Sequence, residues 1–160
     1  MFGNWTAACP VCGADLGPFA GTSLPCRSCR HDWPSVDGIW QLVHPRRERE
    51  ADLFLADYVA IRLSEGRSGR PPGWYTALPS VDPDDPLAEE WRMRAVTWRH
   101  VESKVIAPLA AALGRELDVV DLGAGVAWLS HRLRRGGQRP ISVDVNTDVE
   151  DGLAAARHLT

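Results

Sequence analysis

The chain has 160 residues, of which 44% are hydrophobic and 24% charged, and its formal net charge is −3. This composition is typical of an ordinary globular protein and argues against a disordered chain or a strongly basic nucleic-acid binder. The longest apolar stretch, around residues 105–113, is too short to span a bilayer, so no membrane segment is expected.

All four cysteines lie near the N-terminus in two Cys-x-x-Cys turns, Cys9 with Cys12 and Cys26 with Cys29. Two such turns place four thiolates at the corners of a tetrahedron, which favours Zn²⁺. Four sulfur ligands leave no open coordination position, so we expect a structural and not a catalytic ion. The alternative, two disulfides, requires an oxidising compartment. Because the N-terminus has no signal-type segment, a cytoplasmic zinc protein is expected.

The segment from Cys9 to Val43 resembles two kinds of zinc ribbon, those of the tRNA-methyltransferase-activator type and those at the front of bacterial rRNA guanine methyltransferases. The shared pattern continues after the two turns with an aromatic-Pro pair, then Asp-Gly-Ile and an apolar residue, here Trp33, Pro34, Asp37, Gly38, Ile39 and Leu42. Arg30 stands where a glycine usually follows the last cysteine. The resemblance implies a zinc ribbon over residues 1–44.

The task of the ribbon stays open between two alternatives. In the activator family the ribbon works as a partner subunit, and in the rRNA enzymes it helps to grip RNA. A modest group of basic residues near the ribbon suits RNA, but Glu48 and Glu50 interrupt it; the group is Arg27, Arg30, His31, Arg46, Arg47 and Arg49. RNA and a protein therefore both remain possible partners.

Residues 45–113 are predicted to form a helical connector. Apolar residues at helical spacing predict a first helix over 50–64, with Phe54, Leu55, Tyr58, Val59 and Leu63 on one face. Glycine and proline over 66–73 then break the helix. A longer helix is expected over 87–105, with Trp91, Ala95, Trp98, Val101 and Val105 on one face, and Pro108 is expected to kink or end it.

Seven tryptophans are many for this length. Trp74, Tyr75, Trp91 and Trp98 have the chemistry to form an aromatic lid over a cationic ligand, because ring faces attract cations. Aromatic residues at helical spacing are more often core residues, and we prefer that interpretation. His100, His131 and His158 are isolated in the sequence and are not expected to be ligands.

Residues 118–125, DVVDLGAG, predict a short strand that ends at an acid and opens into a glycine turn. Gly123 and Gly125 allow backbone amides to approach a ligand, and the helix expected over 127–135 points its positive end there. A β-branched run over 141–145 follows, and Asp144 stands at its tip, where a carboxylate can accept both hydroxyl hydrogens of a ribose. The order predicts a parallel strand-helix-strand unit.

Asp121 identifies the kind of nucleotide ligand, since a carboxylate would repel a dinucleotide pyrophosphate but suits an ammonium group. S-adenosylmethionine carries an ammonium group and a ribose. Residues 114–160 resemble the class I S-adenosylmethionine-dependent methyltransferases, whose motif acid-x-Gly-x-Gly-x-Gly is matched by Asp121, Gly123 and Gly125, with Ala127 in place of the third glycine. The resemblance implies a partial Rossmann-like cofactor domain with Asp121, Gly123, Gly125 and Asp144 in its site.

The expected fold class is therefore α/β, with a zinc ribbon, a helical connector and the first β-α-β part of a methyltransferase fold. A helix is expected to begin near Leu153, and the later strands of the family are not present, so we expect an N-terminal portion that is catalytically incomplete. No catalytic residue and no methyl acceptor can be named. The alternative is a non-enzymatic adaptor or relic that docks on a separate methyltransferase.

Overall fold

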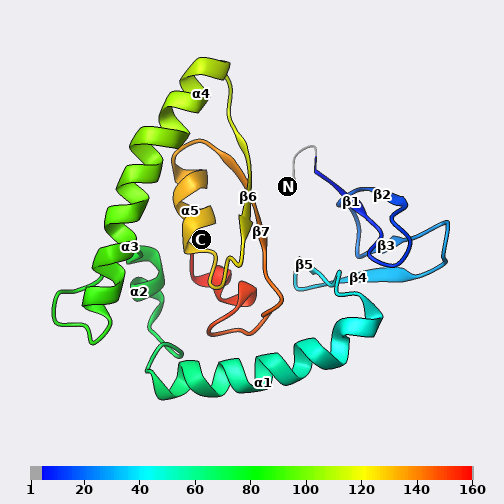
Figure 1. Ribbon diagram of the computed structural model, residues 1–160, viewed down its shortest axis with the longest axis horizontal. Helices are drawn as coiled ribbons and strands as arrows, with labels where there is room; N and C mark the ends of the chain where they lie inside the picture. The colour runs from blue at the N-terminus through cyan, green and yellow to red at the C-terminus, as the bar shows by residue number, and fades with distance from the viewer. Residues whose placement is uncertain (1–4, 160) are drawn as a thin grey trace. The chain divides into compact units, whose positions relative to one another are not determined.

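The computed structural model describes residues 5–159, which form a mixed α/β chain with small sheets and several helices (Figure 1). The chain divides into two compact units, unit 1 (residues 1–61) and unit 2 (residues 62–160), and the division falls inside helix α1 (Glu48–Ser64). The expectation of a mixed α/β chain is confirmed. The sequence favoured boundaries after residues 44 and 113, whereas helices of the expected connector share a core with the region that follows them.

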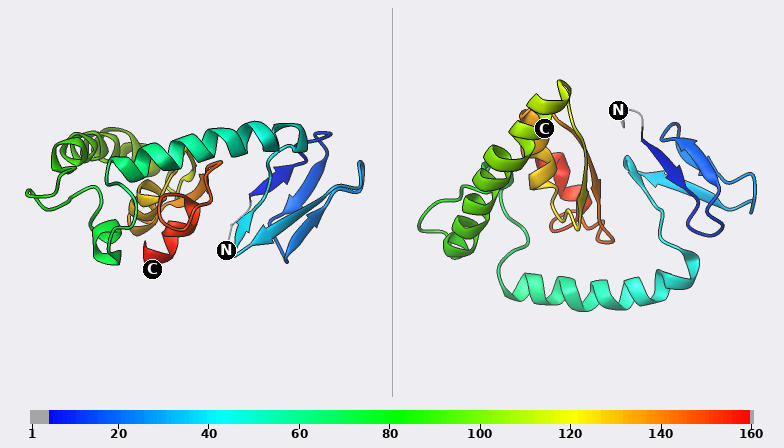
Figure 2. Two further views of the ribbon diagram at one scale, coloured as in Figure 1. Left: turned by 90° about the horizontal axis from the view of Figure 1, so that it is seen from below. Right: turned by 45° about the horizontal axis from the view of Figure 1, so that its top comes forward.

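Unit 1 contains five short strands: β1 (Thr6–Ala8), β2 (Asp15–Pro18), β3 (Ser23–Pro25), β4 (Asp32–Val36) and β5 (Ile39–Trp40). All pair antiparallel, β1 with β2 and β4 with both β3 and β5, as Figure 2 shows. Each Cys-x-x-Cys turn is the tip of a hairpin, the first between β1 and β2 and the second between β3 and β4. Leu24 lies opposite Trp33, and both side chains are buried beside Cys9 and Cys26.

Helix α1 follows a short 3₁₀ turn, Pro45–Arg47, which begins at His44; the His44 Nδ1 accepts a hydrogen bond from the Arg46 N–H at 3.0 Å. The predicted helix is present, but its expected apolar face is not buried. Phe54 is 56% exposed and Leu63 is 66% exposed, and no residue of α1 is buried. Helical spacing identifies which face of α1 is apolar but does not supply a surface to pack against.

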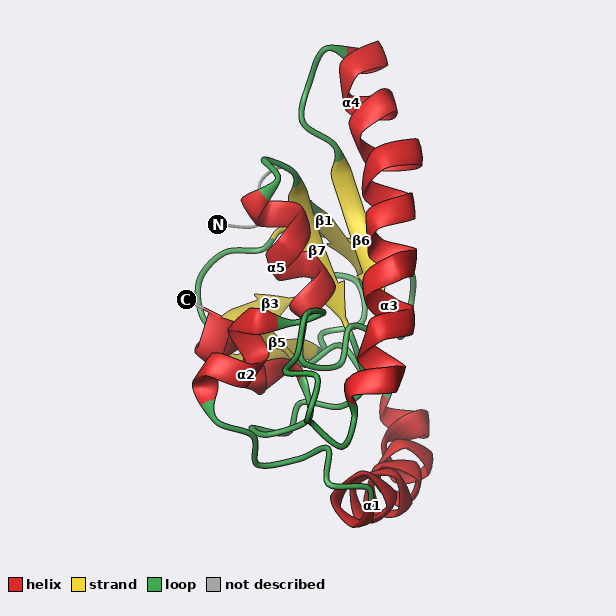
Figure 3. Ribbon diagram, turned by 90° about the vertical axis from the view of Figure 1, so that its left-hand side faces the viewer, coloured by secondary structure: helices red, strands yellow, loops and turns green. Residues whose placement is uncertain are grey.

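Unit 2 contains helix α2 (Pro72–Ala77) and a long helix built from α3 (Ala88–Val101), a π turn (Glu102–Ile106) and α4 (Ala107–Leu113), seen end to end in Figure 3. The helix continues past Pro108, so this proline does not end it. The Ala107 N–H bonds the Glu102 carbonyl five residues back, so the chain widens just before the proline ring. None of the helices formed by residues 5–159 is long and apolar enough to cross a bilayer.

Strands β6 (Asp118–Leu122) and β7 (Arg139–Val143) pair in parallel, and helix α5 (Trp128–Arg135) connects them, so the predicted strand-helix-strand order is present. A 3₁₀ helix, Leu153–Leu159, follows. The Ser130 hydroxyl of α5 contacts both Asp121 and Ser142, so α5 covers that face of the sheet. Side chains of the opposite face are open to solvent, with exposures of 53% for Val120, 80% for Leu122 and 41% for Val143.

In the core of unit 2, aromatic residues that precede β6 in the chain pack against the turn that follows β6. Trp91 packs edge-on against Trp74 and Trp128, with ring centroids 5.5 and 5.6 Å apart. Tyr75 is 1% and Trp91 5% exposed, and both share a cluster with Val126. The preferred interpretation of these aromatic residues as core is thus confirmed, and the Trp98 side chain is also buried.

Candidate metal centre and ligand site

The four cysteine sulfurs form a compact cluster at the hairpin tips of unit 1. All four Sγ atoms lie within 4.8 Å of one another, and two separations are 3.6 Å (Cys9 to Cys29) and 3.5 Å (Cys12 to Cys26). A tetrahedral ion with metal–sulfur bonds of about 2.3 Å requires sulfurs about 3.8 Å apart. The cluster therefore fits Zn²⁺, and the cysteines assigned as metal ligands come together.

The two Cys-x-x-Cys turns have the same backbone pattern. The Gly13 N–H donates to the Cys9 carbonyl at 2.8 Å, and the Arg30 N–H donates to the Cys26 carbonyl at 2.9 Å. Gly13 has φ +74° and Arg30 has φ +63°, so both occupy the left-handed region. Glycine adopts this conformation without cost, but a residue with a Cβ loses about 1–2 kcal/mol. Arg30 therefore leaves the turn intact and adds local strain.

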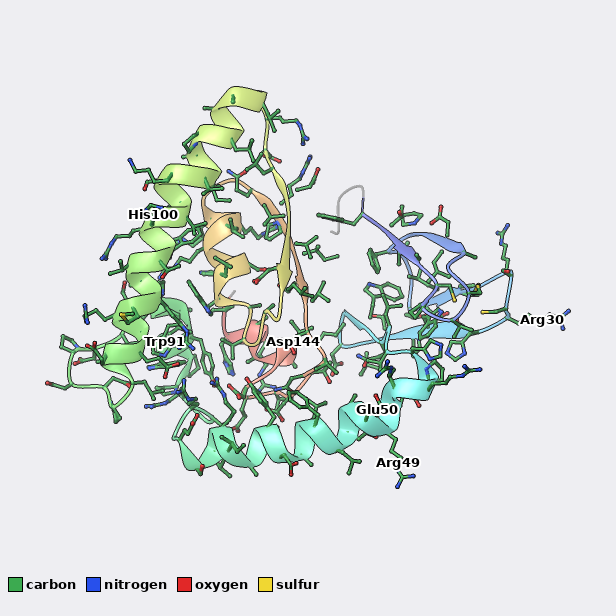
Figure 4. The ribbon with its side chains drawn as sticks, in the orientation of Figure 1. Arg30, Arg49, Glu50, Trp91, His100 and Asp144 are labelled. Atoms are coloured by element: carbon green, nitrogen blue, oxygen red, sulfur yellow. The ribbon has the colours of Figure 1, made fainter. Side chains whose placement is uncertain are left out.

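Replacing Arg30 by glycine is expected to stabilise the ribbon by about 1 kcal/mol, because the strain is relieved and the exposed Arg30 side chain (Figure 4) has no core packing to lose. Thermal unfolding of the zinc-loaded protein measures the change. Arg27→Gly is the matched control: this exposed arginine of the same turn has no positive φ, so glycine there should destabilise. Equal effects of the two substitutions would contradict the strain argument.

The thiols influence one another's ionisation. Burial alone would raise the pKa of Cys9, but hydrogen bonds from backbone N–H groups of its turn, together with the nearby Trp33 indole, lower the pKa to about 6. A backbone N–H of His31 favours the Cys29 thiolate, yet burial and the neighbouring sulfurs raise the pKa of Cys29 to about 12. The cluster is therefore unsuited to carrying four thiolates at neutral pH by itself, and a divalent cation would supply the missing positive charge.

Trp33 contributes to the metal centre in a way that sequence reasoning missed. Its side chain is 2% exposed, and its buried indole N–H lies near enough to Cys9 to favour the thiolate, although it forms no hydrogen bond of standard geometry. An N–H dipole near a ligand sulfur stabilises the thiolate. The aromatic-Pro pattern identified Trp33 as part of the ribbon, but an indole N–H near a ligand sulfur has no sequence signal of its own.

The carboxyl ends of β6 and β7 bring together the four residues assigned to the cofactor. The Gly125 N–H donates to Asp144 Oδ2 at 2.7 Å, and the Gly123 N–H donates to the Val143 carbonyl at 2.8 Å. Both glycines have positive φ, +73° at Gly123 and +51° at Gly125, and a Cβ at either would meet no atom within 4 Å. The turn therefore needs glycine for its conformation and leaves open space beside its backbone.

Asp144 is half-buried, and two backbone amides hold its carboxylate. Oδ2 accepts from Gly125, and Oδ1 accepts from the Asn146 N–H at 2.8 Å; Asp144 is labelled in Figure 4. An ionised carboxylate has about four lone-pair sites, so roughly two remain for a ligand. Asp144 can therefore accept a pair of hydroxyl hydrogens without losing its own supports.

Asp121 is 7% exposed and caps helix α5. Its Oδ2 accepts from the Ser130 N–H at 3.1 Å and from the Ser130 hydroxyl at 2.8 Å, and the Ser142 hydroxyl donates to Ser130 Oγ at 2.7 Å. Burial raises the pKa of Asp121, the bonds from Ser130 oppose that rise, and the charge of Asp144 adds to it. Sequence reasoning missed Ser130. Two neighbouring carboxylates at one sheet edge favour a cation between them.

Ala127, which replaces the third glycine of the motif, is left-handed with φ +59°. The residue before it, Val126, stays out of that region and is buried in the core of unit 2. Steric strain in the left-handed region is largest for a β-branched residue. With alanine there, the conformational free energy rises by only about 1–2 kcal/mol. The left-handed conformation of Ala127 therefore adds local strain to the turn.

The basic residues considered for RNA are spread over unit 1. The side chains of Arg27, Arg46 and Arg49 are exposed, and Arg47 pairs with Glu50 at 2.7 Å. The His31 ring packs on Trp33, with ring centroids 4.2 Å apart, so one face of the imidazole is in contact with the ribbon. In unit 2, His100 is exposed, and His158 stacks on Tyr75 at 4.9 Å.

Comparison of the chain with protein-family models, with curated proteins and with solved structures finds no match.

Proposed function

We propose that the chain carries the methyl-donor part of a class I S-adenosylmethionine-dependent methyltransferase with a Rossmann-like fold. One observation carries the proposal: the glycine-turn amide of Gly125 donates to Asp144 at 2.7 Å, at the edge where two parallel strands end. Ligands of open parallel sheets bind outside the carboxyl ends of the strands. A turn with free space and a fixed acid suits a ribose.

Each residue of the site has a distinct task in this proposal. Asp144 accepts hydrogen bonds from the ribose hydroxyls, Gly123 and Gly125 keep the turn open, and Asp121 offsets the positive charge of the methionine ammonium group. Bound S-adenosylmethionine would supply an activated methyl group. Direct displacement requires the protein mainly to hold donor and acceptor in line, so much of the catalytic effect is positioning.

We also propose that the thiol cluster binds structural zinc in a reducing compartment such as the cytoplasm. The four sulfurs satisfy a tetrahedral ion and leave no position for water or substrate. The task of this ion is therefore to hold the two hairpins together. The acceptor of the methyl group is a separate question, and RNA, protein and metabolite acceptors all fit the proposal.

Replacing Asp144 by alanine is expected to weaken S-adenosylmethionine binding by about 100-fold or more, because two hydrogen bonds to a charged group are lost. Isothermal titration calorimetry on the full chain measures the affinity, and zinc content should stay unchanged. Asp118→Ala is the control, since it removes an exposed carboxylate at the start of the neighbouring strand β6, at the edge of the sheet opposite to Asp144. Equal affinity of the wild type and Asp144→Ala would refute the site.

A non-enzymatic adaptor is the second candidate, and the open sheet face of unit 2 favours it. Val120, Leu122 and Val143 expose apolar surface on a parallel sheet, a kind of sheet that is usually covered on both faces. A separate methyltransferase chain is the partner that this candidate implies. Binding of the methyl donor by the isolated chain favours the enzyme, whereas donor binding only with a partner chain favours the adaptor.

A further inference from the structure

The loop that follows β7, residues 144–152, is held together by hydrogen bonds that its own residues make to Asn146. Asn146 is 5% exposed; its Oδ1 accepts from the Asp148 N–H at 3.0 Å, and its Nδ2 donates to the Asp151 carbonyl at 3.2 Å. The Asn146 carbonyl accepts from the Leu153 N–H at 2.9 Å. The amide side chain makes two of these bonds and the backbone carbonyl the third, so all three meet at the buried Asn146.

Gly152 shows how tightly this loop is packed. A Cβ at this position would lie 2.4 Å from the Asp148 nitrogen, 2.6 Å from the Asn146 carbonyl oxygen and 2.7 Å from Asn146 Oδ1. These separations are far below van der Waals contact, and two of the three atoms belong to the backbone. The space beside Asn146 is thus reserved for the backbone of residue 152, which keeps the Asn146 amide in one position.

Two further contacts fasten the loop to the rest of unit 2. Arg62 donates to both oxygens of the Asp151 carboxylate at 2.6 Å, and Asp151 is 1% exposed. The Tyr75 hydroxyl donates to the Glu150 carbonyl at 2.7 Å. Contacts at Asp151 and at Glu150 therefore hold the loop in place. Asn146 links this loop to Asp144 at the end of β7.

We propose that Asn146 is a positioning residue for Asp144: its side chain fixes the loop so that its own backbone N–H holds the Asp144 carboxylate ready for two ribose hydroxyls. This inference rests on the proposed function. The Asn146 N–H reaches Asp144 Oδ1 at 2.8 Å, and the Gly125 N–H fixes the second oxygen at 2.7 Å. Without the Asn146 side chain the same N–H remains, but its direction is no longer determined.

The test compares S-adenosylmethionine with its 2′-deoxyribose analogue on the full chain by calorimetry. In the wild type, the missing hydroxyl should weaken binding by about 10- to 100-fold, the value of a hydrogen bond to a charged acceptor. In Asn146→Ala this ratio should fall toward unity. A purely structural role would lower the melting temperature and leave the ratio as it is in the wild type.

Tyr75→Phe is the matched control, because it removes another anchor of the same loop without touching Asp144. It should lower the melting temperature and keep the wild-type ratio. Asn146→Asp, which retains the acceptor for the Asp148 N–H, provides a second variant if Asn146→Ala does not fold, and its ratio should also fall. An unchanged ratio in the folded variant would overturn the role of Asn146 alone, whereas no donor binding by the wild type would overturn the proposed function with it.

Discussion

Replacing Cys26 by serine, or removing the metal with a chelator, is expected to unfold the ribbon of unit 1 while unit 2 stays folded. A structural zinc site contributes on the order of 10 kcal/mol, and the small core beside Leu24 and Trp33 is no substitute for it. Zinc per chain should fall, and the resonance of the Trp33 indole N–H should lose its folded position. Metal analysis and NMR measure the two effects.

Ser28→Ala is the control for this prediction, since Ser28 is an exposed residue of the same turn and offers no sulfur. It should bind one zinc ion per chain, like the wild type. Full zinc content in Cys26→Ser would mean that another residue completes the coordination. Simultaneous melting of both units on chelation would contradict their independence.

Replacing Arg62 by methionine is expected to reduce the free energy of unfolding of unit 2 by about 3–5 kcal/mol, the usual cost of leaving one buried charge without its partner. The two guanidinium bonds to Asp151, at 2.6 Å each, are lost, and the carboxylate is buried. Urea denaturation followed by circular dichroism at pH 7 measures the change.

The double variant Arg62→Met/Asp151→Asn should recover most of this loss, because no unpaired charge remains. A surface pair gives the comparison: Arg47 and Glu50 are 73% and 68% exposed, so Arg47→Met should cost at most about 1 kcal/mol. If Arg62→Met proves as mild as Arg47→Met, solvent reaches Asp151 more freely than its burial indicates.

The features that could be predicted from sequence are those with a local signal. Two Cys-x-x-Cys turns predicted the thiol cluster, since each turn places two sulfurs by its own geometry and only the joining of two hairpins is non-local. The glycine turn after DVVD and the acid after ISV likewise predicted that Asp121 and Asp144 would meet, because parallel strands end at one edge.

The features that could not be predicted depend on contacts between distant residues. Nothing near Arg62 in the chain indicates Asp151, which lies 89 residues away. Asn146 and Gly152 belong to an unremarkable polar loop, and their importance comes from the close approach of backbone atoms. The apolar spacing of α1 predicted a helix correctly but not its exposure, because periodicity shows which face is apolar and not whether anything covers it.

The two-stranded sheet of unit 2 offers a template for association between copies of the protein. Within residues 5–159, β6 and β7 pair only with each other, so the outer edge of each carries backbone donors and acceptors that an extended segment of another chain can pair with, next to the exposed Leu122. Every copy offers the same template, so the frequency of such encounters grows with the square of protein concentration. We therefore expect the lifetime of the dispersed protein to depend on its concentration and on whatever covers this sheet, as well as on its folding free energy.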